Sequence, residues 1–418
     1  MNWLVTLGTS VKENKLKALE LALLGLMVLA LPSLEAPKNI FLVFYVVVAL
    51  FRQICNKSTS WEFWDWLFLL WISSALLSTV FAGISPGNEW KGFIMIAKYV
   101  SVGWLIARAN YSVAQLSCLF GVALAAVVPS LIWGYYKYSW LHTKHSLELP
   151  SVGHVNHSAI FITIMFGASV GACLSLWQSA SIKLRIVLLA LTSFLFWSLV
   201  VGQSRGAFGV GILLAIALIA TLSIQGRVKW LATAMVAIMV LMSVLFNTAI
   251  VKKQVENQQK NIILSYRDKV WNISLEASRF YPLFGVGLKN WGLVKPIDIK
   301  KSVESRHQTY NPKDYYFAGY SHNIYLSTLV EQGYVGLCAL LLLMFAWIAH
   351  LVKSHTLTRD SPVAAYLWAG SFSAWLVSFG IGFVNNTIDQ EHGILAFMFL
   401  GLYLSYVRQY APANKQTI

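Results

Sequence analysis

The chain has 418 residues, of which 57% are apolar and 12% charged, and its formal net charge is +15 at pH 7. So few charged residues cannot cover the surface of a water-soluble protein of this length. The composition therefore excludes a soluble globular protein and predicts an all-helical, polytopic membrane protein, organised as a single domain over residues 1–418.

Apolar runs of about 18 residues or more predict about twelve membrane-spanning helices. They lie near residues 16–33, 39–54, 64–83, 90–108, 113–136, 157–178, 185–202, 206–225, 229–250, 322–351, 363–384 and 391–408. Most Lys and Arg residues of the short gaps fall on one side, which places both termini in the cytoplasm. The first run lacks a small-residue cleavage site, so we expect no cleavable signal peptide.

Within the spans, few side chains carry charge, and no pair of interrupted helices repeats, which counts against a secondary transporter. Lys98 in the fourth span is the main exception, and we interpret it as reaching the headgroups or pairing with Glu62 or Asp65. The cysteines lie in or next to spans, and no Cys/His spacing is typical of zinc, so we expect neither a disulfide nor a metal.

One long gap, residues 251–321, holds twelve Lys or Arg residues against six carboxylates. In this topology the gap is a periplasmic loop, where such charge attracts phosphorylated lipids or lipid-linked diphosphates; a merely solvated loop is the alternative. Apolar spacing predicts a helix at about 257–280, which Pro282 ends. Arg267 and Trp271 lie one turn apart on it, an arrangement that suits a phosphate beside a sugar ring.

Three predicted helices begin on the same side with polar segments, at residues 153–158, 202–207 and 320–323. Helix N-termini favour anions because their amides are unpaired. Ser204 and Ser321 are candidate helix caps. Arg205 either binds a ligand or reaches the headgroups, and His322 is either structural or a general base.

Four segments together resemble the O-antigen ligase family, whose domain is shared with O-antigen polymerases and bacterial protein O-oligosaccharyltransferases. The resemblance covers about residues 150–410. Its segments are Gly-His-Val-Asn-His at 153–157; Ser-Arg-Gly at 204–206; Arg267 to Trp271 with Pro-Leu-Phe-Gly-Val-Gly at 282–287; and His-Asn-Ile-Tyr-Leu at 322–326 with Glu-Gln-Gly at 331–333.

The resemblance implies a GT-C-like membrane glycosyltransferase that moves a glycan from undecaprenyl diphosphate to an acceptor at the periplasmic face of the bacterial inner membrane. It implies no cofactor, metal or nucleotide, and no nucleic acid partner. His322 would activate the acceptor hydroxyl, and Arg205 and Arg267 would bind the diphosphate. Further residues are expected to line the donor or acceptor cavity. These are Asn156, His157, Gln203, Trp271, Arg279 and Tyr325.

Among membrane lipids and lipid-linked glycans, we expect the lipid A-core as acceptor, because a cationic loop suits a phosphorylated glycolipid in the same leaflet. Another O-unit or a protein remains an alternative acceptor. A non-catalytic transporter or binding protein for anionic lipids is the alternative from another class. Asp389 and Glu391, at the start of the last span, are explained by the helix dipole.

Overall fold

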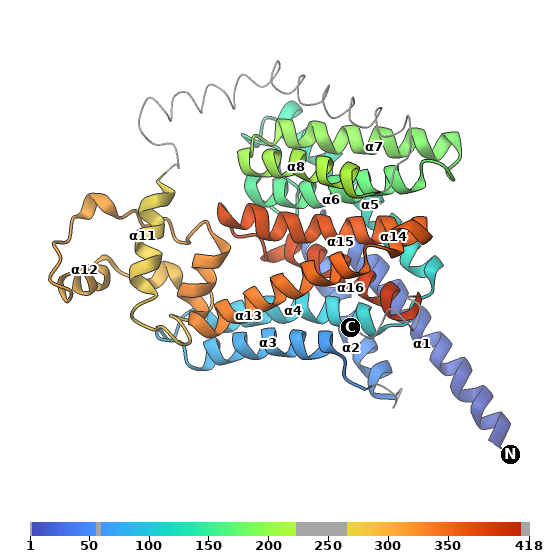
Figure 1. Ribbon diagram of the computed structural model, residues 1–418, viewed down its shortest axis with the longest axis horizontal. Helices are drawn as coiled ribbons and strands as arrows, with labels where there is room; N and C mark the ends of the chain where they lie inside the picture. Colours follow the sequence, from blue (N-terminus) through green and yellow to red (C-terminus); the bar gives the residue numbers. More distant parts are fainter. Residues whose placement is uncertain (1, 56–59, 223–265, 411–418) are drawn as a thin grey trace.

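A computed structural model describes residues 2–55, 60–222 and 266–410, with side chains from Lys15 onward. The regular elements in this part of the chain are all helical (Figure 1). The principal ones are α1 (Asn2–Ala30), α2 (Glu35–Cys55), α3 (Phe63–Val80), α4 (Glu89–Arg108), α5 (Val113–Tyr135), α6 (Val155–Leu176), α7 (Ile182–Val201), α8 (Arg205–Thr221), α11 (Arg267–Ala277), α12 (Pro296–Glu304), α13 (Ile324–Ser354), α14 (Leu357–Asp360), α15 (Pro362–Gly380) and α16 (Gln390–Tyr410).

A helix lies at every predicted span except that at 229–250, which is outside the described residues. Of these helices, 7 are long and apolar enough to cross a membrane: α2, α3, α5, α6, α7, α13 and α15, with α5 and α15 continuing to Trp140 and Phe383. The all-helical, membrane-spanning class is thus confirmed. The full number of spans and the sidedness of the loops stay predictions.

The helices pack in layers, with α7 and α8 outside α6, and with α15 between α6 and α16 (Figure 1). On the other side α4 packs against α16, and α3 against α4 and α13. Small residues permit the close approach of α4 to α16: a Cβ on Gly401 would lie 2.6 Å from the carbonyl oxygen of Gly103. Without a hydrophobic drive in lipid, such backbone proximity is a main source of helix association.

Buried ion pairs join helices at one end of the bundle, where α2, α4 and α16 end. Arg52 binds Glu20, with the second nitrogen–oxygen contact at 3.1 Å, and Arg108 binds Asp65. Arg408 lies 2.9 Å from Glu62. The prediction that Lys98 pairs with Glu62 or Asp65 is therefore wrong, because both carboxylates already have an arginine. Lys98 donates instead to Oδ1 of Asn39, at 2.8 Å.

At the opposite end of α13, a small unit containing α11 and α12 projects from the bundle (Figure 1). It has its own core, in which Trp291 is fully buried and donates to the Ser274 hydroxyl at 3.0 Å. The predicted helix at 257–280 differs from α11. Tyr266 has a left-handed φ of 63°, so a regular helix cannot run through it, and residues 257–265 lie outside the described part.

The glycine-containing segments at 282–287 and 331–333 form the joint between this unit and α13. The amides of Val286 and Gly287 donate to the carbonyls of Val330 and Glu331, at 2.8 and 3.1 Å. In return, α13 breaks its helical geometry at Gly333 (φ 63°, ψ −164°), and a Cβ there would lie 2.3 Å from a backbone oxygen. The joint fixes the small unit against the start of α13.

Candidate active site

Polar side chains meet where α6, α8, α13 and α16 begin and where α11 approaches them. The residues before α8 and α13 have left-handed backbones, with φ 53° at Gln203 and φ 50° at His322. Such a conformation costs about 1–3 kcal/mol in a residue other than glycine, and it occurs preferentially at functional sites. The cap of α13 is Asn323, whose Oδ1 accepts from Leu326 N at 3.0 Å.

The predicted serine caps are not formed. Ser204 occupies the first position before α8 but makes no side-chain cap hydrogen bond. Ser321 is fully buried and donates to the carbonyl of Asn323 at 2.7 Å, which holds the turn that carries His322. The serine thus supports the histidine rather than the helix end.

His322 is partly buried and is surrounded by cationic or ionisable groups. The pKa of its imidazole is lowered to about 4, chiefly by burial and next by the charge of Arg267, with His154 and His157 adding to the effect. A hydrogen bond with Asn385 opposes the shift. The ring lies 4.1 Å from that of Tyr320, and its buried Nδ1 has no hydrogen-bond partner among the described residues. The imidazole is therefore neutral at physiological pH and able to accept a proton.

Arg267, the first residue of α11, is within electrostatic reach of both His322 and Arg205. Burial is the largest cause of the lowered pKa of its guanidinium, and the charge of Arg205, at the first position of α8, is the next. The hydroxyl of Tyr320 lies in the same electrostatic neighbourhood: burial raises its pKa, the charge of Arg267 lowers it and that of Asp389 raises it. The structure thus brings together the imidazole and both arginines predicted from the sequence.

Histidines from α6 and α16 complete the site. Nδ1 of His157 lies 2.8 Å from Nε2 of His392, the rings stack at 5.1 Å, and His154 meets His157 edge-on at 5.8 Å. His392 is fully buried, and its Nδ1 accepts from the amide of Asp389 at 3.4 Å. Sequence reasoning missed His392, since a histidine at the start of an apolar helix gives no signal of its partner more than 200 residues away.

The remaining predicted residues divide into two groups. Asn156 is partly buried at the start of α6, Gln203 is exposed before α8, and Trp271 has a buried indole N–H with no partner among the described residues. Tyr325 and Arg279 are engaged elsewhere. Tyr325 donates to the carbonyl of Phe379 at 2.8 Å. Arg279 pairs with Glu276 at 3.1 Å, with 54% of its side chain exposed.

Glu276 anchors a separate network of the small unit. It accepts from Arg306 through both oxygens, at 2.7 and 2.8 Å, and from Ser302 at 3.0 Å. These bonds hold the pKa of the Glu276 carboxyl below its usual range despite its burial. The network explains Arg279 as a structural residue, whose i,i+3 spacing from Glu276 was the signal in the sequence.

The fold and this site define a multi-pass membrane protein in which two arginines lie near a neutral histidine. Residues 187–341 match the O-antigen ligase family. The matched part contains Arg205, Arg267, the glycine segment at 282–287 and His322, so it confirms the resemblance that these motifs indicate. The segment at 153–157 lies outside it. No curated protein matches the chain.

Metal ligands do not gather at this site: the described residues contain no group of three or more His, Cys, Asp or Glu side chains arranged to hold an ion. The four cysteines, all described, are free thiols. The charged group with the largest effect on the pKa of His322 is the guanidinium of Arg267. What the site can do chemically is accept a proton at the imidazole and bind an anion at the guanidinium groups.

Proposed function

We propose that the protein is a glycosyltransferase of lipopolysaccharide biosynthesis, an O-antigen ligase. It transfers O-antigen polysaccharide from undecaprenyl diphosphate to the lipid A-core oligosaccharide at the periplasmic face of the bacterial inner membrane. In this proposal the chain has about twelve spans in a GT-C-like arrangement, with both termini in the cytoplasm. The match to the O-antigen ligase family at residues 187–341 supports the reaction class.

One observation carries the proposal: a neutral imidazole lies within electrostatic reach of Arg267, which in turn lies within reach of Arg205. Two guanidinium groups that lie near each other repel, and a bound anion offsets that repulsion. A diphosphate has the charge and the oxygen geometry to do so.

The reaction assigned to these groups is a single displacement. The acceptor hydroxyl oxygen attacks C1 of the donor sugar, the bond from C1 to the diphosphate oxygen breaks, and His322 takes the hydroxyl proton. The guanidinium groups of Arg205 and Arg267 offset the charge that develops on the leaving undecaprenyl diphosphate. A general base contributes about 10²- to 10⁴-fold to such a step. One displacement inverts the configuration at C1.

The acceptor distinguishes the members of this superfamily. The lipid A-core is favoured because the cationic residues of 266–321 suit a phosphorylated glycolipid. An O-antigen polymerase or a protein O-oligosaccharyltransferase would use the same base and arginines on another O-unit or on a Ser/Thr hydroxyl. A non-catalytic transporter or binding protein for anionic lipids would use the cations alone.

The test is transfer by the purified protein from undecaprenyl-diphosphate glycan, offering lipid A-core, free O-unit and a peptide in parallel, with and without a chelator. We expect product with lipid A-core in both conditions. His322→Ala should lower transfer at least about 10²-fold while donor binding, expression and membrane insertion persist. The matched control is His145→Ala, an exposed histidine.

Each alternative has its own outcome. Unchanged transfer by His322→Ala would remove His322 as the base, and binding of donor without any transfer by the wild type would favour the non-catalytic protein. Product with free O-unit or with the peptide alone would identify a polymerase or a protein glycosylase. Transfer that stops when the chelator is added would contradict the assignment of charge neutralisation to the two arginines.

A further inference from the structure

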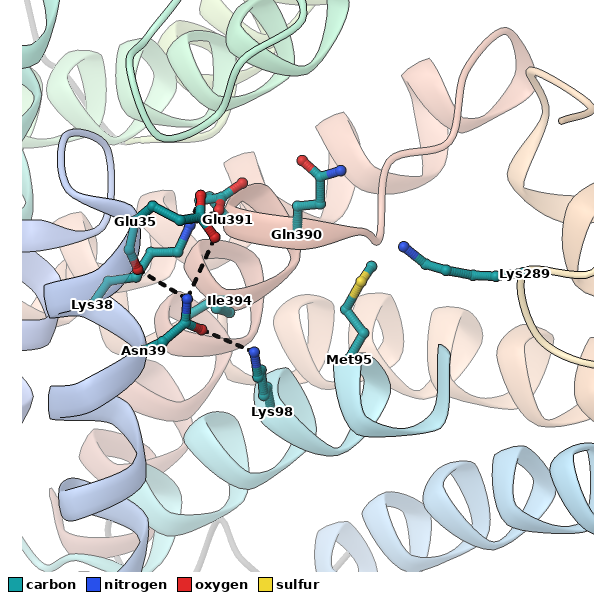
Figure 2. A pocket seen from close by; sticks show the side chains of 9 residues that line it. All are labelled: Glu35, Lys38, Asn39, Met95, Lys98, Lys289, Gln390, Glu391 and Ile394. Carbon is teal, nitrogen blue, oxygen red and sulfur yellow. Dashed lines mark hydrogen bonds and ion pairs between the residues drawn. The ribbon is translucent and has the colours of Figure 1, made fainter. Parts of the chain in front are cut away.

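A second polar cavity lies beside the histidine site, between the starts of α2, α4 and α16. Its volume is about 260 Å³. The lining consists of Glu35, Lys38, Asn39, Met95, Lys98, Lys289, Gln390, Glu391 and Ile394 (Figure 2). Pockets that enclose whole small molecules measure roughly 300–1,000 Å³, so this one suits a single polar group of a larger ligand.

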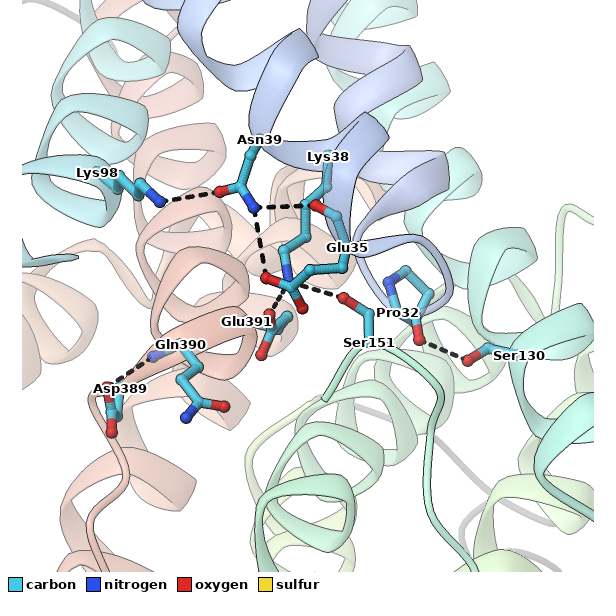
Figure 3. Close-up of polar contacts among 10 residues, drawn as sticks. All are labelled: Pro32, Glu35, Lys38, Asn39, Lys98, Ser130, Ser151, Asp389, Gln390 and Glu391. Carbon is cyan, nitrogen blue, oxygen red and sulfur yellow. Dashed lines mark hydrogen bonds and ion pairs between the residues drawn. The ribbon is translucent and has the colours of Figure 1, made fainter. Parts of the chain in front are cut away.

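One wall of the cavity is a closed network around Lys38. Its ammonium binds Glu391, lies 3.0 Å from Glu35 and 2.7 Å from the Ser151 hydroxyl, and so uses all three of its hydrogens (Figure 3). Lys38 and Glu391 are only 3% and 4% exposed. Helix-dipole attraction, which the sequence suggested for Glu391, is therefore not its main role. The carboxylate ties α16 to α2.

An oxygen of this wall is left without a partner. Oε2 of Glu391 is buried and accepts no hydrogen bond from the described residues, although the residue lines the cavity. A buried acceptor without a donor costs about 1–3 kcal/mol, more when it is charged. A hydroxyl or N–H group of a ligand in the cavity would supply the missing donor.

The other wall offers cations with spare donors. Lys98 makes one hydrogen bond within the described part of the chain, to Asn39, so two of its three N–H groups are not used there (Figure 2). Lys289 lies 3.7 Å from Asp389, an ion pair too long for a hydrogen bond. The cavity therefore combines donors for an anion with an acceptor for a hydroxyl.

The cavity and the histidine site share the start of α16. Gln390 and Glu391 line the cavity, while the next residue, His392, stacks on His157. Asp389 links the two sides as well, since its carboxylate pairs with Lys289 and its amide donates to His392. The cavity and the residues that surround the proposed reaction are thus linked by neighbouring positions at the start of α16.

We propose that this cavity binds a phosphorylated sugar of the acceptor glycolipid, with Lys98 and Lys289 on the phosphate and Glu391 accepting from a sugar hydroxyl. The assignment of this ligand to the acceptor rests on the proposed function. Phosphate is recognised by lysine as a point charge, and each charge-assisted bond changes affinity by about tenfold or more. The Lys38 network would act as the rigid support of this wall.

The test is binding, without donor, to the full-length protein in nanodiscs of zwitterionic lipid. The probes are lipid A-core glycolipid, the same glycolipid after phosphatase treatment, inorganic phosphate, and phosphatidylglycerol as a competitor. We expect the phosphorylated glycolipid to bind at least about tenfold more tightly than the dephosphorylated one. Lys98→Gln and Lys289→Gln should each remove most of that difference. Lys91→Gln, an exposed lysine of the same helix α4, should keep it.

Equal affinity for the two glycolipids, or an unchanged difference in both lysine variants, would overturn the proposal. Displacement by phosphatidylglycerol would overturn it too, by showing a general lipid-headgroup site, and displacement by millimolar inorganic phosphate alone would show that the sugar contributes nothing. A transfer assay distinguishes the two proposals. Phosphate-dependent binding without transfer would support the cavity proposal and contradict the proposed function. Transfer with an unchanged Michaelis constant for the acceptor in Lys98→Gln would support the proposed function and contradict the cavity proposal.

Discussion

Two clusters of charged residues, at opposite ends of the helix bundle, differ in the sign of the charges that lie together. At the end where α2 and α4 finish, Arg52 binds Glu20 and Arg108 binds Asp65, and in both pairs the two partners are nearly inaccessible to solvent. At the end where α8 and α13 begin, the charges of Arg267 and Arg205 act on each other, and that of Arg267 also acts on the neutral imidazole of His322. Like charges that lie near each other repel, and a bound anion offsets that repulsion.

The difference distinguishes residues that fix the packing of the helices from residues that bind a ligand. A buried carboxylate–arginine pair joins two helices, and removing one partner leaves the other charge unpaired, so the pair fixes packing. A cluster of like charges raises the free energy of the protein alone and is offset when an anion binds. The two arginines of the histidine site are of the second kind, and we expect the residues of that site to affect binding and turnover more than stability.

Replacing one partner of a buried carboxylate–arginine pair should have the largest effect, and the effect should be on stability. Asp65→Asn removes the carboxylate that holds Arg108 and accepts from the Trp104 indole at 2.7 Å. Losing one partner of a buried pair costs about 3–5 kcal/mol. We expect a clear fall of the thermal midpoint of the detergent-solubilised protein, with transfer per folded molecule unchanged. A lower turnover of folded protein at an unchanged midpoint would contradict the division between the two ends.

Replacing an arginine of the histidine site should lower turnover. Arg267→Lys keeps the charge but loses the planar fork that binds two phosphate oxygens, so we expect about a hundredfold lower kcat with donor, an effect of about 2.7 kcal/mol. The thermal midpoint should stay within a degree or two of the wild type. Arg52→Lys is the matched comparison, and it should lower the midpoint while leaving kcat unchanged. Wild-type kcat in Arg267→Lys would remove Arg267 from the diphosphate site.

Sequence reasoning located Arg267 by its spacing of one turn from Trp271, and the family resemblance supplied the roles of all three site residues. It located His322 and Arg205 because each lies where a polar segment meets an apolar run, which hydropathy reveals directly. It placed helices correctly for the same reason. It did not find the ion pair between Lys38 and Glu391, nor the His157–His392 stack, since their partners lie more than 230 residues apart. The full helix predicted at 257–280 ignored the left-handed Tyr266, which side-chain periodicity does not record.

The smallest effect concerns the pH at which the histidine site loses its base. Burial and the charge of Arg267 lower the pKa of His322 to about 4. At pH 5 about 90% of such a ring is neutral, against about 3% for an ordinary histidine with a pKa near 6.5. We therefore expect kcat/KM, which reports the free enzyme, to stay level down to about pH 5 and to fall below pH 4. Recovery of activity on return to pH 7 would exclude acid unfolding.

The charge of Arg267 can be tested as a contributor to this low pKa, because two substitutions at one position separate charge from shape. Arg267→Lys keeps a cation and should leave the acid limb near pH 4, whereas Arg267→Gln removes it and should move the limb to higher pH, only partly, since burial is the larger cause. Modification of His322 by diethylpyrocarbonate, which needs the neutral ring, follows the same titration in variants with little turnover. The depressed pKa also means that the folded protein binds fewer protons than the unfolded chain, so this residue costs stability as the pH falls from 6.5 through 4. An acid limb at the same pH in both variants would show that the charge of Arg267 does not contribute to the low pKa of His322, and that burial sets it.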